Sequence, residues 1–142
     1  MILVDANLLV SAWNRDDIRH EVARDWLEGR LGGLEGVGLP WASLLAFVRI
    51  TSNPRIFPTP ARASDAWGQV QEWLARPNVF VPEPTGRHAA LLDGLVPVVD
   101  RAHLVPDAHL AALAMEYGLI LCSADRDFAR FPGLRWMDPL VG

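Results

Sequence analysis

Lysine is absent from this chain of 142 residues, and all 13 basic side chains are arginines. This absence argues against a P-loop nucleotide site, a Schiff-base enzyme and a receiver-type phosphoacceptor domain, because each of these normally depends on a lysine. The single cysteine, Cys122, permits no internal disulfide and no cysteine-rich zinc site. No hydrophobic run approaches the length of a membrane span, and the first ten residues lack the basic segment of a signal peptide. We therefore expect a soluble cytoplasmic protein without a membrane partner.

The net charge is −4, and 51% of the residues are hydrophobic. A negative chain is a poor candidate for a nucleic-acid binder that works by bulk charge alone. The sign is less decisive if carboxylates hold a divalent metal ion, because the metal then faces the phosphate. The length and the hydrophobic content suggest one compact domain over residues 1–142 with a substantial core.

Short apolar runs alternate with helical patterns along the whole chain. Alternation of this kind predicts an α/β fold in which helices cover both faces of a parallel sheet. Such sheets bind their ligands at the carboxyl ends of the strands. The strands are expected at residues 1–4, 37–39, 79–81, 119–122 and 134–137, and the helices at 7–13, 18–30, 41–51, 61–75, 86–94 and 107–117.

Acidic residues follow two of the expected strands. Asp5 comes directly after the first strand, Asp125 and Asp127 follow the fourth, and Asp107 begins the helix that precedes the fourth. In a parallel sheet Asp5 and Asp125 emerge at the same edge, and helix packing could bring Asp107 there too. Hard cations relieve the repulsion in such a set, and Mg²⁺ or Mn²⁺ fits best. Two such ions can activate water and stabilise the leaving oxygen of a phosphodiester.

Each of these residues also has a purely structural interpretation. Asp5 and Asn7 could cap the first helix or form an Asx turn. Asp107 could complement a helix dipole, which is the commoner role for a single aspartate at such a position. Asp125 and Ser123 could cap the short segment that follows. The joint pattern at two strand ends and one helix start favours a site.

Three stretches carry a resemblance to a known family. "ILVDANLLV", "VPDAHLAALAMEYG" and "LCSADRDFARFPGLRW" resemble, in order and spacing, the acidic motifs of the PIN-domain family. Within it they are most similar to the VapC toxins of bacterial toxin–antitoxin pairs. The resemblance implies a three-layer Rossmann-like fold with a central, mainly parallel sheet, and magnesium-dependent endoribonuclease activity. It also implies RNA as the substrate, a cognate VapB-like antitoxin and a homodimer.

The motif match implies a role for each matching side chain. Asp5, Asp107 and Asp125 would be metal ligands, Asp127 would complete the catalytic acidic set, and Asn7 and Ser123 would support it.

The chain departs from the family pattern at one position. PIN nucleases usually carry a glutamate on the helix after the second strand, in a Ser–x–x–Glu–x–x–Arg-like setting. Here the stretch reads "SLLAFVR", and Ala46 stands between Ser43 and Arg49. A site with one carboxylate fewer should hold a second metal ion more weakly. Because the surrounding segment resembles one branch of VapC-like toxins, we interpret the change as a variant of the site.

The roles of several arginines and tryptophans stay open at this level. Arg49 could pair with an active-site carboxylate, contact RNA phosphate or form a structural salt bridge. Arg126 and Arg130 could clamp a phosphate backbone, although a solvated surface pair is commoner. Trp13 or Trp41 could stack on bases, although core packing is commoner.

Three functions are compatible with the sequence. The first is a metal-dependent endoribonuclease that acts as a toxin. The second is a small metal-dependent phosphatase that uses the same acidic cleft. The third is a degenerate PIN domain that binds RNA or a partner protein.

Overall fold

A five-stranded sheet forms the centre of the computed structural model, which describes residues 1–141; residue 142, the last of the expected domain 1–142, lies outside the described residues. The strand order is β3-β2-β1-β4-β5, and every neighbouring pair is parallel. Each strand lies within its expected range: β1 Ile2–Val4, β2 Val37–Gly38, β3 Val79–Phe80, β4 Ile120–Cys122 and β5 Trp136–Met137. The predicted parallel α/β sheet is confirmed.

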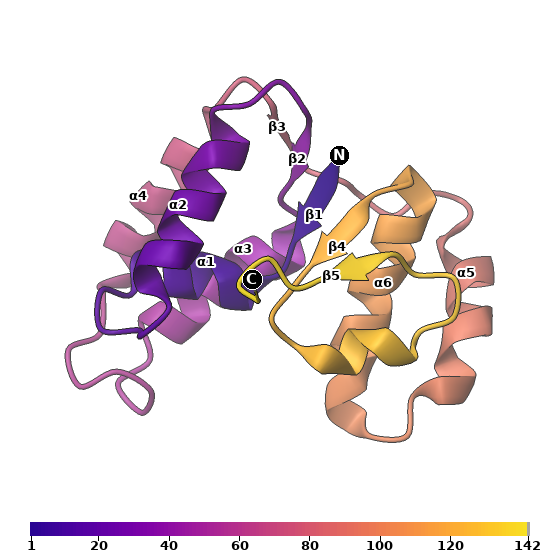
Figure 1. The fold of residues 1–142 in the computed structure, drawn as a ribbon. Coiled ribbons are helices and arrows are strands. Elements are labelled where there is room, and N and C mark those ends of the chain that lie inside the picture. Colours follow the sequence, from indigo (N-terminus) through magenta and orange to yellow (C-terminus); the bar gives the residue numbers. More distant parts are fainter. Residues whose placement is uncertain (142) are drawn as a thin grey trace.

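Helices cover both faces of this sheet and complete a three-layer fold (Figure 1). Helices α1 to α4 pack on one side, whereas α5 and α6 pack on the other (Figure 1). Within the described part of the chain, none of the helices is both long and apolar enough to span a membrane. The helices are α1 Ala6–Trp13, α2 His20–Leu31, α3 Trp41–Thr51, α4 Ala63–Leu74, α5 His88–Leu95 and α6 Val105–Tyr117, with short 3₁₀ segments η1 Val96–Val98, η2 Ala102–Leu104 and η3 Arg126–Arg130.

The two faces of the sheet supply two hydrophobic cores. Ile2 and Val4 of β1 pack into the core beneath α1 to α4, whereas Leu3 packs into the core beneath α5 and α6. This alternation follows from the period of two in a strand, where successive side chains point to opposite faces. Because both faces are buried, β1 is apolar throughout, and the first polar residue after it marks the rim of the sheet.

Helix α6 is buried through its middle, as its continuous apolar run predicts. Residues 110–114 are all buried. Gly118 ends the helix in the left-handed conformation, with φ 64° and ψ 33°, which suits glycine because it has no Cβ. From there the chain enters β4 directly. The start of α6 therefore lies toward the edge where β1 and β4 end, and this places Asp107 near both strand ends.

Candidate active site

Asp5 lies at the junction of β1 and α1. Its backbone N–H donates to the Cys122 carbonyl at 3.0 Å and extends the β1–β4 ladder by one residue. Its Oδ1 accepts a 2.7 Å hydrogen bond from the backbone N–H of Ala6 and caps α1. Its Oδ2 accepts from Ser123 Oγ at 2.8 Å and from Asn7 Nδ2 at 3.3 Å. Asp5 therefore caps α1, as one interpretation of the sequence predicted, and its second carboxylate oxygen takes part in a separate polar network.

Ser123 joins the ends of β1 and β4 through that network. The residue is fully buried. Its hydroxyl donates to Asp5 and accepts from Asn7 Nδ2 at 2.9 Å and from the backbone N–H of Asp125 at 3.0 Å. The Asn7 side-chain oxygen accepts in turn from the backbone N–H of Ala124 at 3.3 Å. A buried hydroxyl with three partners fixes the geometry of both strand ends.

Three carboxylates converge beside this network. Asp107, Asp125 and Asp127 can each offer one oxygen so that all three oxygens lie within 4.8 Å of one another. Asp107 lies in the first turn of α6, and Asp125 caps η3 by accepting from the backbone N–H of Asp127 at 2.9 Å. All three side chains are partly buried. The structure thus brings together three of the four acidic residues singled out in the sequence, and Asp5 lies outside this group of three.

Burial and nearby negative charge raise the pKa of two of the carboxyl groups, Asp107 and Asp5. Burial, together with the negative charges of Asp5, Asp125 and Asp127, raises the pKa of Asp107 to about 6, against a smaller opposing effect of His103. Burial also raises the pKa of Asp5, and the nearby Asp125 adds to this, although hydrogen bonds from Ser123 and Ala6 act in the opposite direction. The negative charge of Asp5 therefore acts on Asp107, even though Asp5 supplies none of the three clustered oxygens.

The donor set fits a hard divalent cation. Carboxylate oxygens are the ligands preferred by Mg²⁺ and Mn²⁺, and Mg²⁺ usually needs only one or two carboxylates because it keeps several waters. A cation would also offset the repulsion that, after burial, contributes to the raised pKa of Asp107. The residues placed to hold it are Asp107, Asp125 and Asp127. A ligand role for Asp5, implied by the motif match, stays a prediction.

His103 contacts the acidic group, and Asp100 pairs with Arg130 beside it; neither residue was predicted. Nε2 of His103, in η2, lies 3.6 Å from Asp127 Oδ2. Asp100 accepts a hydrogen bond from Arg130 at 2.9 Å, and the same guanidinium lies 3.4 Å from Asp127. Arg130, a predicted RNA contact, is thus paired with two aspartates. The position of His103 four residues before Asp107 is the signal that could have pointed to it, because such a spacing matches one helical turn.

The remaining predicted side chains lie apart from this group. Arg126 is exposed at the start of η3 and lines a surface pocket with Trp136 and Asp138. Arg49 is exposed in the last turn of α3, and the ion pairs found among residues 1–141 do not include it. Ala46 is partly buried in the middle of α3.

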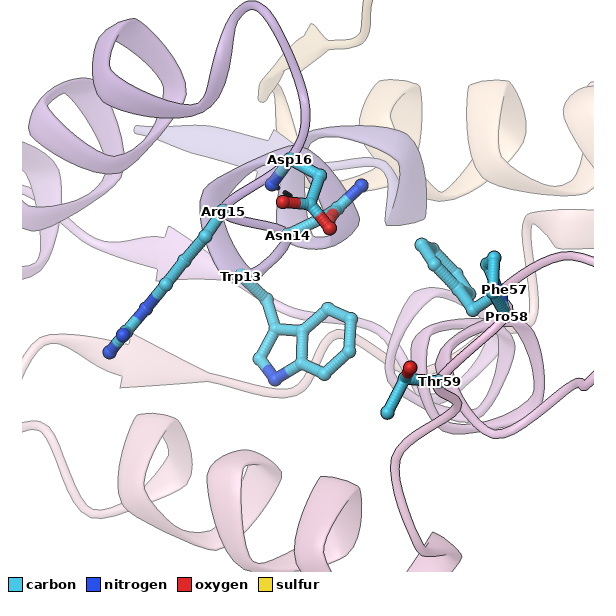
Figure 2. A pocket seen from close by; sticks show the side chains of 7 residues that line it. All are labelled: Trp13, Asn14, Arg15, Asp16, Phe57, Pro58 and Thr59. Atoms are coloured by element: carbon cyan, nitrogen blue, oxygen red, sulfur yellow. Dashed lines mark hydrogen bonds between the residues drawn. The ribbon is translucent and has the colours of Figure 1, made fainter.

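Trp13 lies at the end of α1 that is distant from Asp5. It lines a pocket of about 330 Å³ together with residues 14–16 and 57–59, and Figure 2 shows its indole facing the segment of Phe57. Its ring meets Phe57 edge-on at 5.7 Å and Phe47 at 6.2 Å. The length of α1, eight residues or roughly 12 Å, separates Trp13 from Asp5. Trp13 therefore packs on aromatic neighbours, as the commoner of its two interpretations predicts.

The fold and the site define a class, the three-layer α/β proteins whose carboxylates gather where the strands of a parallel sheet end. The sequence model of the PIN domain matches residues 2–134, which is nearly the whole chain. The chain belongs to the PIN-domain family.

Known proteins resemble the chain over its full length. Ribonuclease VapC37 of Mycobacterium tuberculosis (strain ATCC 25618 / H37Rv) is 44% identical over 140 residues, which cover 98% of this chain and 97% of the relative. The solved structure of Mycobacterium tuberculosis VapC20, described as a sarcin-ricin loop cleaving toxin, matches with a TM-score of 0.68 at 22% identity and covers 95% of this chain and 99% of its own. VapBC2 from Rickettsia felis, solved with a promoter DNA fragment, matches with a TM-score of 0.68 at 15% identity and covers 97% of this chain and 98% of its own. The two structures show the shared fold.

Proposed function

We propose that the protein is a magnesium-dependent endoribonuclease that acts as the toxin of a type II toxin–antitoxin pair. The observation that carries the proposal is the group formed by Asp107, Asp125 and Asp127, with three oxygens within 4.8 Å of one another. The relative with 44% identity is named a ribonuclease, which supports RNA as the substrate. Mn²⁺ is the alternative ion, because it accepts the same ligands.

Each residue of the site has a distinct task in this proposal. Asp107, Asp125 and Asp127 would hold the cation, which supplies Lewis acidity for hydrolysis of a phosphodiester. Ser123 and Asn7 donate to Asp5 Oδ2 and fix the orientation of that carboxylate at the rim of the group. We also assign a catalytic role to Asp5, the fourth acidic residue predicted for the site.

Arg130 and His103 act on the charge of the group. The Arg130 guanidinium contacts Asp127 and Asp100, so its positive charge offsets part of the negative charge there. His103 contacts the other oxygen of Asp127. Contact of Arg130 or Arg126 with the RNA backbone remains part of the proposal, and for Arg130 it requires that the guanidinium exchange or share its present partners.

The proposed partners follow from the relatives. The solved neighbour from Rickettsia felis is a VapBC assembly on promoter DNA. For this chain we propose a VapB-like antitoxin that neutralises the toxin, a homodimer, and a cytoplasmic location. We also propose that residues 1–142 act as a single domain. Co-expression with the product of a small neighbouring reading frame, followed by size-exclusion chromatography, tests the first two.

Cleavage of structured RNA by the purified protein tests the activity. We expect fragments with Mg²⁺, none with a chelator, and no hydrolysis of a chromogenic phosphomonoester. Hydrolysis of the phosphomonoester without RNA cleavage would instead identify a phosphatase. Metal-independent RNA binding without cleavage would identify a degenerate PIN domain.

A further inference from the structure

A second pocket opens at the same edge of the sheet as the acidic group. It has a volume of about 240 Å³, and its walls are residues 40–42, residues 82–84, His109 and Leu113. Residues 40–42 follow β2 and residues 82–84 follow β3, so both segments leave the carboxyl edge of the sheet. Strands in a sheet lie about 4.8 Å apart, which puts the ends of β2 and β3 within about 10 Å of the end of β1. His109 lies two residues beyond Asp107 on α6.

The wall formed by residues 82–84 is held rigidly against α6. Tyr117 Oη donates to the Glu83 carbonyl at 2.7 Å and accepts from the Glu83 N–H at 3.3 Å. Glu116 accepts from both the N–H and the hydroxyl of Thr85, at 2.8 and 2.7 Å. Prolines at positions 82 and 84 restrict the backbone further. The pocket is therefore shaped before any ligand enters.

His109 is oriented by a chain of side chains behind it. Nδ1 of His109 lies 3.0 Å from Nε2 of His88, and Nδ1 of His88 lies 2.6 Å from Oε2 of Glu116. The Glu116 side chain is shielded from solvent. Burial raises its pKa, but hydrogen bonds from Thr85 and His88 outweigh this effect, so the pKa of Glu116 lies below its ordinary value. This series of contacts engages Nδ1 of His109. Among the hydrogen bonds of residues 1–141, none engages the other nitrogen, Nε2, which leaves it for a ligand.

Trp41 supplies a flat apolar surface to the same pocket. The indole is 39% exposed and stacks on Trp67, with centroids 6.3 Å apart and planes inclined by 17°. Trp41 lines the pocket and Trp67 does not, so the surface turned to the pocket differs from the one that Trp67 covers. An aromatic ring fixed by a second ring is a platform on which a nucleobase can stack.

The residues that line the pocket disfavour the phosphate of a nucleotide and suit its base. No arginine lines the pocket and Glu83 does, so a phosphate would meet no positive partner and one negative residue. A planar group with hydrogen-bonding edges fits a ring platform, an imidazole nitrogen and a carboxylate. The volume lies below the roughly 300–1,000 Å³ of pockets for drug-sized ligands, which limits the occupant to a small ring system.

We propose that this pocket binds one nucleobase of the RNA substrate next to the phosphate that is cleaved, with Trp41 stacking on the base and His109 Nε2 contacting its edge. The pocket would give the enzyme a base preference at one fixed position beside the cut. Glu116 and His88 act as positioning residues for His109. This inference rests on the proposed ribonuclease activity, since the base is a part of that substrate.

Cleavage of a pool of RNA oligomers randomised around the cut site tests the proposal, with the fragment ends sequenced. Wild type should show a preference for particular bases at one position. Trp41→Ala and His109→Leu should flatten this preference and raise KM roughly five- to hundredfold, the range that corresponds to the loss of one stacked base. At saturating RNA, kcat should stay within about threefold of wild type, and calorimetric Mn²⁺ binding should be unchanged.

Two variants separate ligand contact from a structural effect. His109→Gln, which keeps a hydrogen-bonding group, should recover part of the preference that His109→Leu loses. Leu45→Ala, which alters an exposed residue one turn along α3 and outside the pocket, should keep both the preference and KM. Wild-type preference and KM in both Trp41→Ala and His109→Leu would overturn the proposal.

A binding measurement keeps the proposal distinct from the activity. Fluorescence anisotropy of a labelled RNA oligomer, recorded with Ca²⁺ in place of Mg²⁺, should show weaker binding for Trp41→Ala than for Leu45→Ala. If wild type cleaves no RNA, the proposed function fails, and this measurement still decides the pocket. Equal affinity of the two variants in that case would overturn the base-binding site as well.

Discussion

Replacing Asp107 with asparagine should stabilise the metal-free protein and remove its stabilisation by divalent metal. In the absence of metal, burial and the nearby charges of Asp5, Asp125 and Asp127 raise the pKa of Asp107 from 3.8 to about 6. A raised pKa in a carboxyl group means that the folded state binds the proton more tightly than the unfolded state does. The contribution of Asp107 to the free energy of unfolding is therefore greatest below about pH 4, falls as the pH rises to about 6, and stays low above that.

The two pKa values give the magnitude. A difference of roughly two pH units corresponds to about 3 kcal/mol. Because the side chain is only partly buried, solvent screening reduces this to about 1–2 kcal/mol. Loss of the helix-dipole interaction at the start of α6 costs about 0.3–1 kcal/mol in the opposite direction. The net expectation at pH 7.5 is a gain of about 1 kcal/mol, which is a rise in Tm of roughly 2–6 °C for a chain of this length.

Thermal unfolding in chelator, and then with increasing Mn²⁺, provides the assay. Wild type should gain stability with Mn²⁺ by mass action, whereas Asp107→Asn should gain much less. The free energy of unfolding of the variant should also lose the part of its pH dependence that lies between about pH 4 and 6. If Asp107 served only the helix dipole, the variant would melt lower than wild type in chelator, and Mn²⁺ would stabilise both proteins equally. That result would exclude a metal-ligand role for Asp107.

Three further substitutions test other parts of the site. Asp125→Asn should slow single-turnover RNA cleavage on the order of a hundredfold, which corresponds to about 3 kcal/mol of transition-state stabilisation. The Tm should not fall, because asparagine caps as well as aspartate. Near-wild-type cleavage would mean that Asp125 in "SADRDF" serves only to form a turn. Ala46→Glu should tighten Mg²⁺ binding in calorimetry and speed cleavage at low Mg²⁺, and an unchanged Mg²⁺ dependence in a folded variant would mean that position 46 does not face the site. Ser123→Ala should lower the free energy of unfolding in urea by about 1–3 kcal/mol, because Asp5 and Asn7 lose a buried partner; a loss below about 0.5 kcal/mol would contradict that role.

Periodicity and strand-end chemistry were sufficient to predict the sheet and the edge at which the acidic residues gather. The strands β1 and β4 are buried on both faces, so they appear in the sequence as continuous apolar runs, and the aspartates that follow them mark the edge. Helix boundaries were less certain. The helix expected from Asp107 begins at Val105, because Pro106 fits the first turn, where its missing N–H is not needed.

Contacts between distant segments could not be predicted from local patterns. Asp100 and Arg130 are 30 residues apart, and only the packing of η3 against the segment before α6 pairs them. Likewise, His109 and Glu116 lie seven residues apart on α6, a helical spacing visible in the sequence, but His88 reaches them from α5. Which three of the four acidic residues form the closest group also depends on side-chain geometry that spacing does not fix.

Diffraction from Mn²⁺-soaked crystals, collected at the manganese absorption edge, would show where the cation binds. We expect an anomalous peak among the carboxylates of Asp107, Asp125 and Asp127, with metal–oxygen distances of roughly 2 Å. The same peak should weaken or vanish in crystals of Asp107→Asn. A peak elsewhere, or none among these carboxylates in crystals of protein that cleaves RNA with Mn²⁺, would contradict a metal site at these three residues.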